Sequence, residues 1–257
     1  MDTGKTIILV TGGNSGIGFE TVSALAAASS DYHIILACRS VEKGEEASRE
    51  ITSALGNSLK GSISVVALDL TIQETIIAAK TQVEKEFGRV DVLINNAGII
   101  FYQEADTLTS LRTTFETNVF GTALVTEAFV ELLKKSNNPY LIYVSSGQGS
   151  ITLRCDTTYK YYNVPGDHYR MSKSALNMLA ACHRWTFSDF GCKVVAFCPG
   201  FCVTNLTGAQ GREMRIKRGG RDAKEPANAL VDVVQGKRDE DIQKNGIVSV
   251  DGGIMPW

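Results

Sequence analysis

Short apolar runs alternate with longer amphipathic segments along most of this 257-residue chain. The runs are rich in Val and Ile and are four to six residues long, which is typical of β-strands. Because they are almost continuously apolar, they predict parallel strands that are buried on both faces. We expect strands at 6–10, 33–38, 64–68, 90–94, 141–144, 193–197 and 246–250.

The segments between these runs carry the apolar periodicity of helices. We expect helices at 16–28, 41–55, 72–87, 107–135 with a break, 168–190 and 226–235. Strands that alternate with helices predict an α/β fold with a doubly wound, Rossmann-type sheet of about seven parallel strands and helices on both faces. Since no repeat or linker interrupts the pattern, residues 1–257 are expected to form one domain.

Two stretches depart from this alternation of strands and helices. Residues 147–167 contain Tyr159, Tyr161 and Tyr162. Residues 205–225 carry several basic side chains among glycines, including Arg212, Arg215, Lys217, Arg218 and Arg221. Long loops in a compact domain are usually lids or disordered segments. The basic stretch is more typical of solvated charge than of a binding patch.

Composition narrows the range of partners. The chain has 44% hydrophobic and 21% charged residues and a formal net charge of −2, which gives no field that would attract nucleic acid or an anionic membrane. The first residues lack the basic segment followed by an apolar run that is typical of a signal peptide. No apolar stretch of the chain reaches the length that a membrane span needs. We therefore expect a cytoplasmic protein whose partners are small molecules.

The six cysteines and three histidines show no metal-ligand spacing. The chain is too large to need disulfides, so buried, reduced thiols and no metal are expected.

A glycine-rich turn follows the first strand and opens the first helix. Gly12 permits a tight turn, Gly16 lets a pyrophosphate approach the backbone, and Gly18 allows close helix packing. The free amides and the dipole of the helix N-terminus favour an anion there. This context predicts a dinucleotide site at Gly12, Asn14, Ser15, Gly16, Ile17 and Gly18.

The end of the second strand bears on the choice of coenzyme. It reads Cys38-Arg39-Ser40, without the acidic residue that would bind the ribose hydroxyls of NAD. A contact between Arg39 and a 2′-phosphate would favour NADP(H) by about ten- to a hundredfold. The alternative is a solvated arginine before a helix that Ser40 caps.

Tyr169 and Lys173 are four residues apart in a predicted helix. This spacing places both side chains on one helix face, where the ammonium can stabilise the phenolate. A nucleotide site combined with such an acid suggests redox chemistry on a carbonyl or an alcohol.

Taken together, these motifs resemble the short-chain dehydrogenase/reductase family over nearly the whole chain. The motifs occur in order as TGGNSGIG at 11–18, Asp69-Leu70, Asn95-Asn96-Ala97-Gly98, Asn118, Ser145-Ser146, YRMSK at 169–173, Pro199-Gly200 and Thr204. The resemblance implies that Ser146 hydrogen-bonds the substrate oxygen, Tyr169 delivers the proton, Lys173 binds the nicotinamide ribose, and Asn118 holds a water beside that lysine. It also implies coenzyme contacts from Asp69, Leu70, Asn95, Ala97, Gly98, Tyr169, Lys173, Pro199, Gly200, Cys202 and Thr204.

The distance from Ser146 to Tyr169 is a departure from the family pattern. It is 23 positions, whereas the family commonly has about a dozen, so an insert is expected at the mouth of the site. The insert resembles in kind that of carbonyl reductases, and it would either form an aromatic wall over the substrate or remain a surface excursion. A further alternative is that the insert covers the helix surface through which relatives assemble, so monomer and homo-oligomer both stay open.

We therefore expect NADPH-dependent reduction of a ketone or aldehyde, with Tyr169 as general acid. The alternatives are an NAD(P)+-dependent alcohol or hydroxysteroid dehydrogenase, a non-catalytic NADP(H) sensor, and a scaffold for a non-redox step. Sequence does not set the direction of the reaction, because one site serves both directions.

Overall fold

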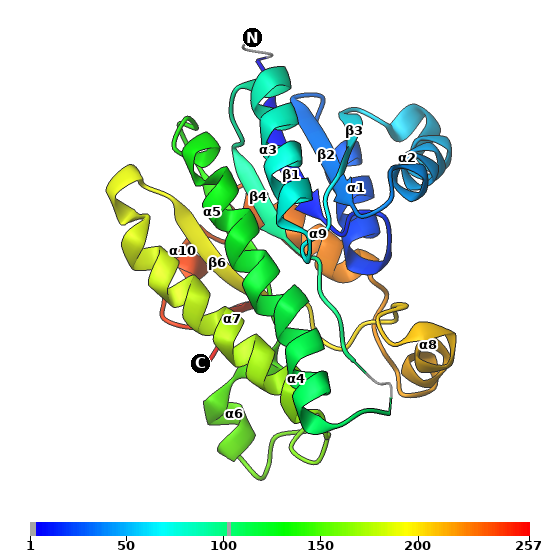
Figure 1. Ribbon diagram of the computed structural model, residues 1–257, viewed down its shortest axis with the longest axis vertical. Helices are drawn as coiled ribbons and strands as arrows, with labels where there is room; N and C mark the ends of the chain where they lie inside the picture. Colours follow the sequence, from blue (N-terminus) through cyan, green and yellow to red (C-terminus); the bar gives the residue numbers. More distant parts are fainter. Residues whose placement is uncertain (1–3, 102–103) are drawn as a thin grey trace.

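A sheet of eight strands forms the centre of the molecule, with helices on both of its faces (Figure 1). This computed structural model describes residues 4–101 and 104–257. The strand order is β3-β2-β1-β4-β5-β6-β7-β8, and β8 alone pairs in an antiparallel manner. The strands are β1 (Thr6–Thr11), β2 (Tyr32–Cys38), β3 (Ser62–Ala67), β4 (Val92–Asn95), β5 (Tyr140–Val144), β6 (Lys193–Cys198), β7 (Ile247–Ser249) and β8 (Ile254–Met255).

The predicted fold class is therefore confirmed, and β8 is the strand that the pattern did not predict. Its two residues are too few to show an alternation of apolar and polar positions.

Most helices coincide with the predicted amphipathic segments. The helices are α1 (Gly16–Ala28), α2 (Val41–Leu55), α3 (Gln73–Phe87), α4 (Thr107–Phe115), α5 (Thr122–Leu133), α6 (Ile151–Cys155), α7 (Asp167–Thr186), α8 (Gly208–Lys217), α9 (Lys224–Val234) and α10 (Asp239–Ile242).

The break expected within 107–135 is a π-helical segment, Glu116–Gly121, between α4 and α5. The two stretches that were expected to be loops, 147–167 and 205–225, also contain helices. Short α6 lies beside the start of α7, and α8 stands apart from the sheet (Figure 1).

Burial on both faces of the sheet explains the continuous apolar runs. Successive strand residues point to opposite faces. Leu9 packs in the cluster that contains residues of α3, α5 and α7, whereas Ile8 packs in the cluster that contains residues of α1, α2 and α9. All of β5 is buried in the same two-sided way.

The strand order reverses at β1, since the chain proceeds outward through β2 and β3 and then returns to β4 on the other side of β1. In open parallel sheets, ligands bind at the carboxyl ends of the strands where the order reverses. The glycine turn and Asn95–Gly98 follow β1 and β4, so the topology brings these two motifs together.

The cysteines are free as expected, but two of them are not buried. All six are free, and Cys38, Cys192, Cys198 and Cys202 are buried. Cys155 and Cys182, in α6 and α7, are exposed. Within the described residues, no helix has the length and apolarity that a membrane span requires.

Candidate active site

A cleft of about 940 Å³ runs along the carboxyl ends of the parallel strands. Segments that follow β1 to β6 all contribute to its lining. The predicted site residues that line it are Gly12, Asn14, Ser15, Gly16, Ile17, Arg39, Asp69, Leu70, Ala97, Gly98, Ser146, Tyr169, Lys173, Pro199, Gly200, Cys202 and Thr204. The others, Gly18, Ser40, Asn95 and Asn118, lie outside the lining.

The turn after β1 has the backbone that its glycines allow. Gly12 and Gly16 have positive φ angles of 65° and 56°, which side chains other than hydrogen rarely tolerate. Gly18 is packed, since a Cβ there would overlap the carbonyl of Gly12 and the side chain of Asn96. Gly18 therefore fixes the turn from behind and does not face a ligand.

Asn96, which directly follows β4, supports the same turn and lines the cleft. It is not among the site residues that the sequence predicted. Its Nδ2 donates to the carbonyl of Thr11 at 2.8 Å, and its backbone N–H donates to Thr11 Oγ1 at 3.0 Å. The Asn95-Asn96-Ala97-Gly98 motif indicated that an asparagine lies near the coenzyme site. The sequence alone does not tell which of the two asparagines turns toward β1.

Asn95 braces the fold instead of lining the cleft. It is 3% exposed, and its Nδ2 donates to Thr126 Oγ1 at 2.9 Å. Thr126 Oγ1 is also hydrogen-bonded to the hydroxyl of Tyr143, and this hydroxyl lies 2.6 Å from His183 Nδ1. This buried polar chain ties β4 and β5 to α5 and α7.

The far end of the cleft carries the residues expected near adenosine. Arg39 is exposed, and no hydrogen bond or ion pair joins it to the described residues. Ser40 instead caps α2, where its hydroxyl accepts from the N–H of Lys43. Asp69 Oδ1 accepts from the N–H and the hydroxyl of Thr71 at 2.9 and 2.7 Å, so one carboxylate oxygen orders its own turn.

Tyr169 and Lys173 are one turn apart on α7, as the spacing predicted. Lys173 is 5% exposed, and its Nζ donates to the carbonyl of Val144 at 2.8 Å. The ammonium lies 5.8 Å from the ring centre of Tyr169. Burial lowers the pKa of Lys173 to about 8, because the charged form loses its hydration.

The two serines after β5 point in different directions, as strand alternation requires. Ser145 is 2% exposed and donates to Asn177 Oδ1 at 2.5 Å. Ser146 begins the next turn, where its hydroxyl oxygen accepts from the N–H of Gln148 at 3.1 Å. The Ser146 hydroxyl proton remains available to a ligand.

Asn118 lies in the π-helical segment and is fully buried. Its Oδ1 accepts from the N–H of Ile99 at 2.8 Å, and its Nδ2 donates to the Ile99 carbonyl at 2.9 Å and to Ser172 Oγ at 3.1 Å. The side chain therefore holds the connection after β4 against α7. That it holds a water beside Lys173 stays a prediction.

The segment after β6 closes over the glycine turn. Gly200 has a positive φ of 75°, and Cys202 Sγ donates to the Pro199 carbonyl at 3.1 Å. Thr204 packs against the turn, since a Cβ on Gly16 would lie 3.4 Å from its side chain. The segment from Pro199 to Thr204 therefore lies beside the glycine turn.

Aromatic residues form the end of the cleft beyond Tyr169. Tyr159 and Tyr161 line it with their rings 5.5 Å apart in an edge-to-face arrangement, and Tyr161 lies 6.3 Å from the ring of Phe201. Arg170 is 5% exposed and donates to the carbonyls of Tyr161 and Val164, each at 2.8 Å. The insert is therefore held in place from α7.

Helix α8 lies in the stretch 205–225 that the sequence indicated as a basic loop, more typical of solvated charge than of a binding patch. Met214, Arg215 and Arg218 line the cleft, and Arg215 is only 7% exposed. Arg212 and Arg215 lie three residues apart on α8, and Arg218 follows the last residue of the helix. The glycines around them concealed this helix.

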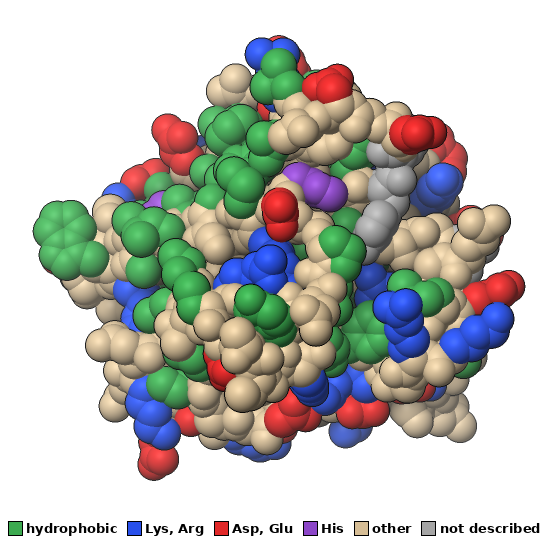
Figure 2. Space-filling view, turned by 90° about the horizontal axis from the view of Figure 1, so that it is seen from below, with side chains coloured by type: hydrophobic (Ala, Val, Ile, Leu, Met, Phe, Trp, Pro, Cys, Tyr) green, Lys and Arg blue, Asp and Glu red, His purple; other side chains and the backbone are tan. Residues whose placement is uncertain are grey.

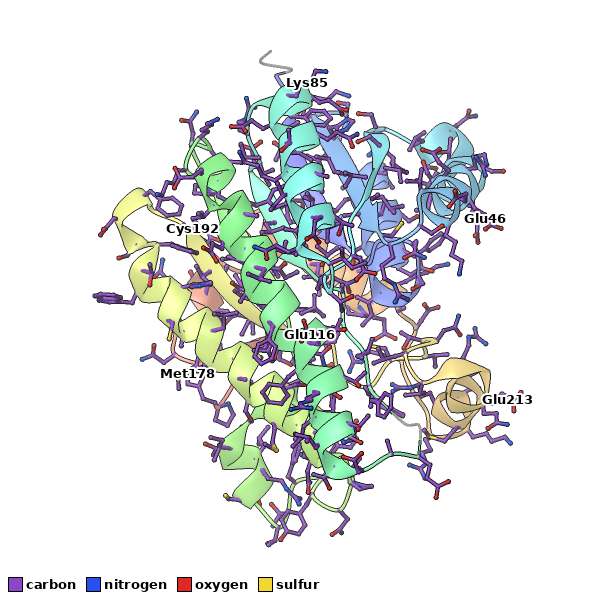
Figure 3. All side chains as sticks on the ribbon, in the orientation of Figure 1. Glu46, Lys85, Glu116, Met178, Cys192 and Glu213 are labelled. Carbon is purple, nitrogen blue, oxygen red and sulfur yellow. The ribbon has the colours of Figure 1, made fainter. Side chains whose placement is uncertain are left out.

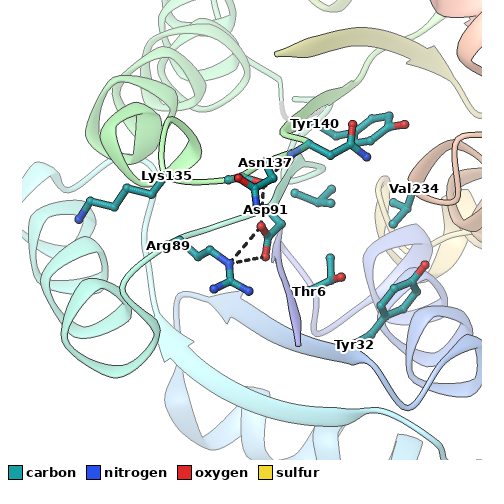
Figure 4. Close-up of a pocket in the computed structure, with 11 residues that line it drawn as sticks. Thr6, Tyr32, Arg89, Asp91, Lys135, Asn137, Tyr140 and Val234 are labelled. Carbon is teal, nitrogen blue, oxygen red and sulfur yellow. Dashed lines mark hydrogen bonds and ion pairs between the residues drawn. The ribbon is translucent and has the colours of Figure 1, made fainter. Parts of the chain in front are cut away.

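A second hollow of about 270 Å³ lies at the opposite, amino-terminal edge of the sheet (Figure 4). Asp91 at its centre accepts from the N–H of Ile7 at 2.7 Å, from Arg89 Nε at 3.2 Å and from Ser136 Oγ at 2.6 Å. Because protein groups already bind this carboxylate, the hollow is best explained as a structural junction.

Comparisons with known proteins agree with this geometry. A family model described as short chain dehydrogenase matches residues 6–215. The short-chain dehydrogenase anuI of Penicillium roqueforti is 39% identical over 80% of this chain and 82% of its own length. The short-chain dehydrogenase/reductase tropE of Talaromyces stipitatus is 33% identical over 98% of both chains.

Among solved structures, an NADPH-bound carbonyl reductase from chicken fatty liver is similar. It has a TM-score of 0.76 and 26% identity, over 98% of this chain and 99% of that chain.

Proposed function

Because this chain belongs to the short-chain dehydrogenase family, we propose that it reduces a ketone or aldehyde with NADPH, using Tyr169 as general acid. Membership makes it an oxidoreductase that acts on CH–OH or C=O groups. The observation that carries the proposal is the buried ammonium of Lys173 beside Tyr169, in the same cleft as the glycine turn. A charge that is costly to bury indicates a function.

The residues present fit a dinucleotide. The positive φ angles of Gly12 and Gly16 turn the chain away just before α1, and Ser15 at the N-cap makes no side-chain cap bond. The first amides of α1 are therefore available to a pyrophosphate. Ala97 and Thr204 flank this turn on both sides.

Arg39 supports a preference for NADPH. It is exposed at the end of β2, lines the cleft and has no carboxylate beside it in the described structure. A 2′-phosphate would supply the missing partner through a charge-assisted hydrogen bond. The similar carbonyl reductase from chicken fatty liver is NADPH-bound, which agrees with this choice.

When bound, the nicotinamide supplies the hydride that reaches the carbonyl carbon. Ser146 would donate its hydroxyl proton in a hydrogen bond to the carbonyl oxygen, where negative charge develops. Tyr169 would transfer its phenolic proton to that oxygen. Lys173 would stabilise the phenolate that remains, because its ammonium lies on the same face of α7.

The test uses Tyr169→Phe, with turnover followed by NADPH absorbance against a panel of ketones and aldehydes. We expect turnover to fall by at least about a thousandfold, since the general acid is lost, while the Kd for NADPH stays within about twofold. A variant that retains near-normal turnover would refute the assignment of Tyr169. An unmodified protein that binds NADPH but turns over no carbonyl or alcohol would favour the sensor.

A further inference from the structure

The charges that line the cleft are strongly unbalanced. Five cationic residues line it against one carboxylate, although the whole chain has a net charge of −2. The residues are Arg39, Lys160, Lys173, Arg215 and Arg218, with Asp69 as the carboxylate.

The coenzyme accounts for only part of this positive charge. Arg39 and Asp69 follow β2 and β3 at the adenosine end, and Lys173 belongs to the catalytic pair. Lys160 comes from the insert, Arg215 comes from α8, and Arg218 directly follows α8. Lys160 lies over the ring of Tyr161 and Arg215 over the ring of Phe201, and the two rings are 6.3 Å apart, so these two cations lie at the aromatic end of the cleft.

Arg215 is the most informative of the three. It is 7% exposed and lies over the ring of Phe201, with its guanidinium carbon 5.2 Å from the ring centre. Its Nη1 donates to the Cys202 carbonyl at 3.1 Å, and its Nε to Thr207 Oγ1 at 3.4 Å. These bonds fix the plane of the guanidinium and leave Nη2 without a hydrogen-bond partner in the described part of the chain.

None of the three cations is neutralised by the protein. No ion pair links Lys160, Arg215 or Arg218 to a carboxylate within residues 4–101 and 104–257. Glu213 belongs to the same helix but points away from the molecule (Figure 3). Buried charges are normally paired, so the guanidinium of Arg215 indicates an anionic ligand group.

Arg212 and Arg215, both on α8, differ in their exposure. Lys and Arg side chains stand out on the α8 lobe of the face shown in Figure 2. Arg212 is exposed and does not line the cleft, whereas Arg215 is buried and does line it. The two arginines therefore differ in what they can bind, despite lying one turn apart.

Resting on the proposed function, we infer that the substrate is an aromatic carbonyl compound that carries a carboxylate. Its ring would lie against Tyr161 and Phe201, and its carboxylate would receive hydrogen bonds from Arg215. Arg218 and Lys160 would add attraction from the exposed side. A coenzyme phosphate is the other source of an anion, but Phe201 places Arg215 beside Tyr161 in the substrate half.

The first experiment compares 4-acetylbenzoate with its methyl ester, which has the same ring and ketone without the charge. We expect kcat/KM to be at least tenfold higher for the acid in the unmodified protein. Arg215→Gln should remove this preference, and Arg218→Gln should reduce it without disturbing a buried contact. Arg212→Gln is the matched control on α8 and should leave the preference unchanged. Equal efficiency with acid and ester in the unmodified protein would overturn the inference.

Equilibrium binding separates this inference from the proposed function. The Tyr169→Phe protein with NADPH bound should bind 4-acetylbenzoate at least tenfold more tightly than the ester by calorimetry, whether or not turnover occurs. Absence of turnover with preserved discrimination would count against the proposed function alone. A rise in the Kd for NADPH in Arg215→Gln, with acid and ester still distinguished, would assign the arginine to the coenzyme and refute the inference.

Discussion

The two ends of the cleft are built in different ways. The coenzyme end consists of short connections that begin directly at the carboxyl ends of β1 and β4, so the register of the sheet fixes their positions. The substrate end consists of residues 147–167 and α8, which lie beyond the strands and are held by side chains such as Arg170. One half therefore inherits its geometry from the fold, and the other depends on a few local hydrogen bonds.

This difference explains what substitutions should do. A change in the coenzyme half acts on backbone that is packed against the sheet and should alter binding strongly. A change in the substrate half should alter the fit of one ligand and leave the fold intact. Lys173 lies where the two halves meet, and it should give the largest effect.

Replacing Lys173 by Met should abolish activity and also stabilise the protein. Turnover should fall by about a thousandfold or more, because the ammonium that lies beside Tyr169 and would stabilise its phenolate is lost. Burial that lowers a lysine pKa from 10.5 to about 8 costs at most about 3 kcal/mol at neutral pH. Allowing for the lost bond to Val144, we expect a gain of about 1–2 kcal/mol and a Tm about 3–6 °C higher.

The pH dependence of that gain has a definite sign. The folded state disfavours the ammonium, so the cost of Lys173 is complete below about pH 8 and disappears between pH 8 and 10.5. The stability advantage of Lys173→Met, measured by urea unfolding, should therefore shrink as the pH rises through this window. The exposed Lys43→Met is the control. An advantage that does not depend on pH would show that Lys173 is not charged in its buried position.

Gly18→Ala tests the coenzyme half. The added methyl would overlap the Gly12 carbonyl and Asn96, so the turn must shift. Such overpacking costs about 1–3 kcal/mol and should raise the Kd for NADPH by about ten- to a hundredfold. Gly44→Ala is the control, since its methyl would lie 2.5 Å from Val65 Cγ1 in the packing of α2. It should lower Tm without a comparable change in Kd. Equal effects of both variants on Kd would show that the turn has no special role.

Arg39→Ala should have a smaller and more selective effect. We expect kcat/KM for NADPH to fall by about tenfold, since one charge-assisted contact is lost, while kcat/KM for NADH stays unchanged. Arg49→Ala, also exposed and on α2, provides the control. Equal efficiency with both coenzymes in the unmodified protein would refute the preference.

The same contrast decides how much the sequence could predict. Gly12, Tyr169 and Lys173 line one cleft, and the sequence could bring them together because their spacing is tied to strands and helix turns. Asn95 and Ser40 were expected at the coenzyme, but the structure turns Asn95 into the core and uses Ser40 as a cap. Their side chains have two possible neighbours of similar chemistry, and only the packing selects one.

The substrate half was less predictable, for a physical reason. Tyr161 and Arg215 are separated by more than fifty positions, and no periodicity relates them. Their proximity depends on Phe201 and on the hydrogen bonds of Arg170 and Arg215, which connect irregular backbone to helices. A pattern of apolar positions carries no information about such contacts.

Arg170→Met tests the substrate half of the cleft. Its expected effect is the smallest of these predictions. The change removes the donors that the carbonyls of Tyr161 and Val164 use, at a cost of about 1 kcal/mol for the wall that they form. The wall should loosen, so KM for the carbonyl substrate should rise about three- to fivefold. The values of kcat and the Kd for NADPH should change little, since the catalytic pair and the coenzyme half do not depend on the insert.

Arg154→Met is the matched control for this variant. Arg154 also bonds the insert, through the carbonyl of Tyr162, and its guanidinium lies 5.3 Å from the ring centre of Tyr162. However, Arg154 is exposed, and neither residue lines the cleft. Its loss should leave KM within about twofold, because an exposed contact of this kind contributes little. If Arg170→Met instead lowered kcat and raised the Kd for NADPH together, the two halves would be coupled, and Arg170 would act on the position of Tyr169 as well as on the wall.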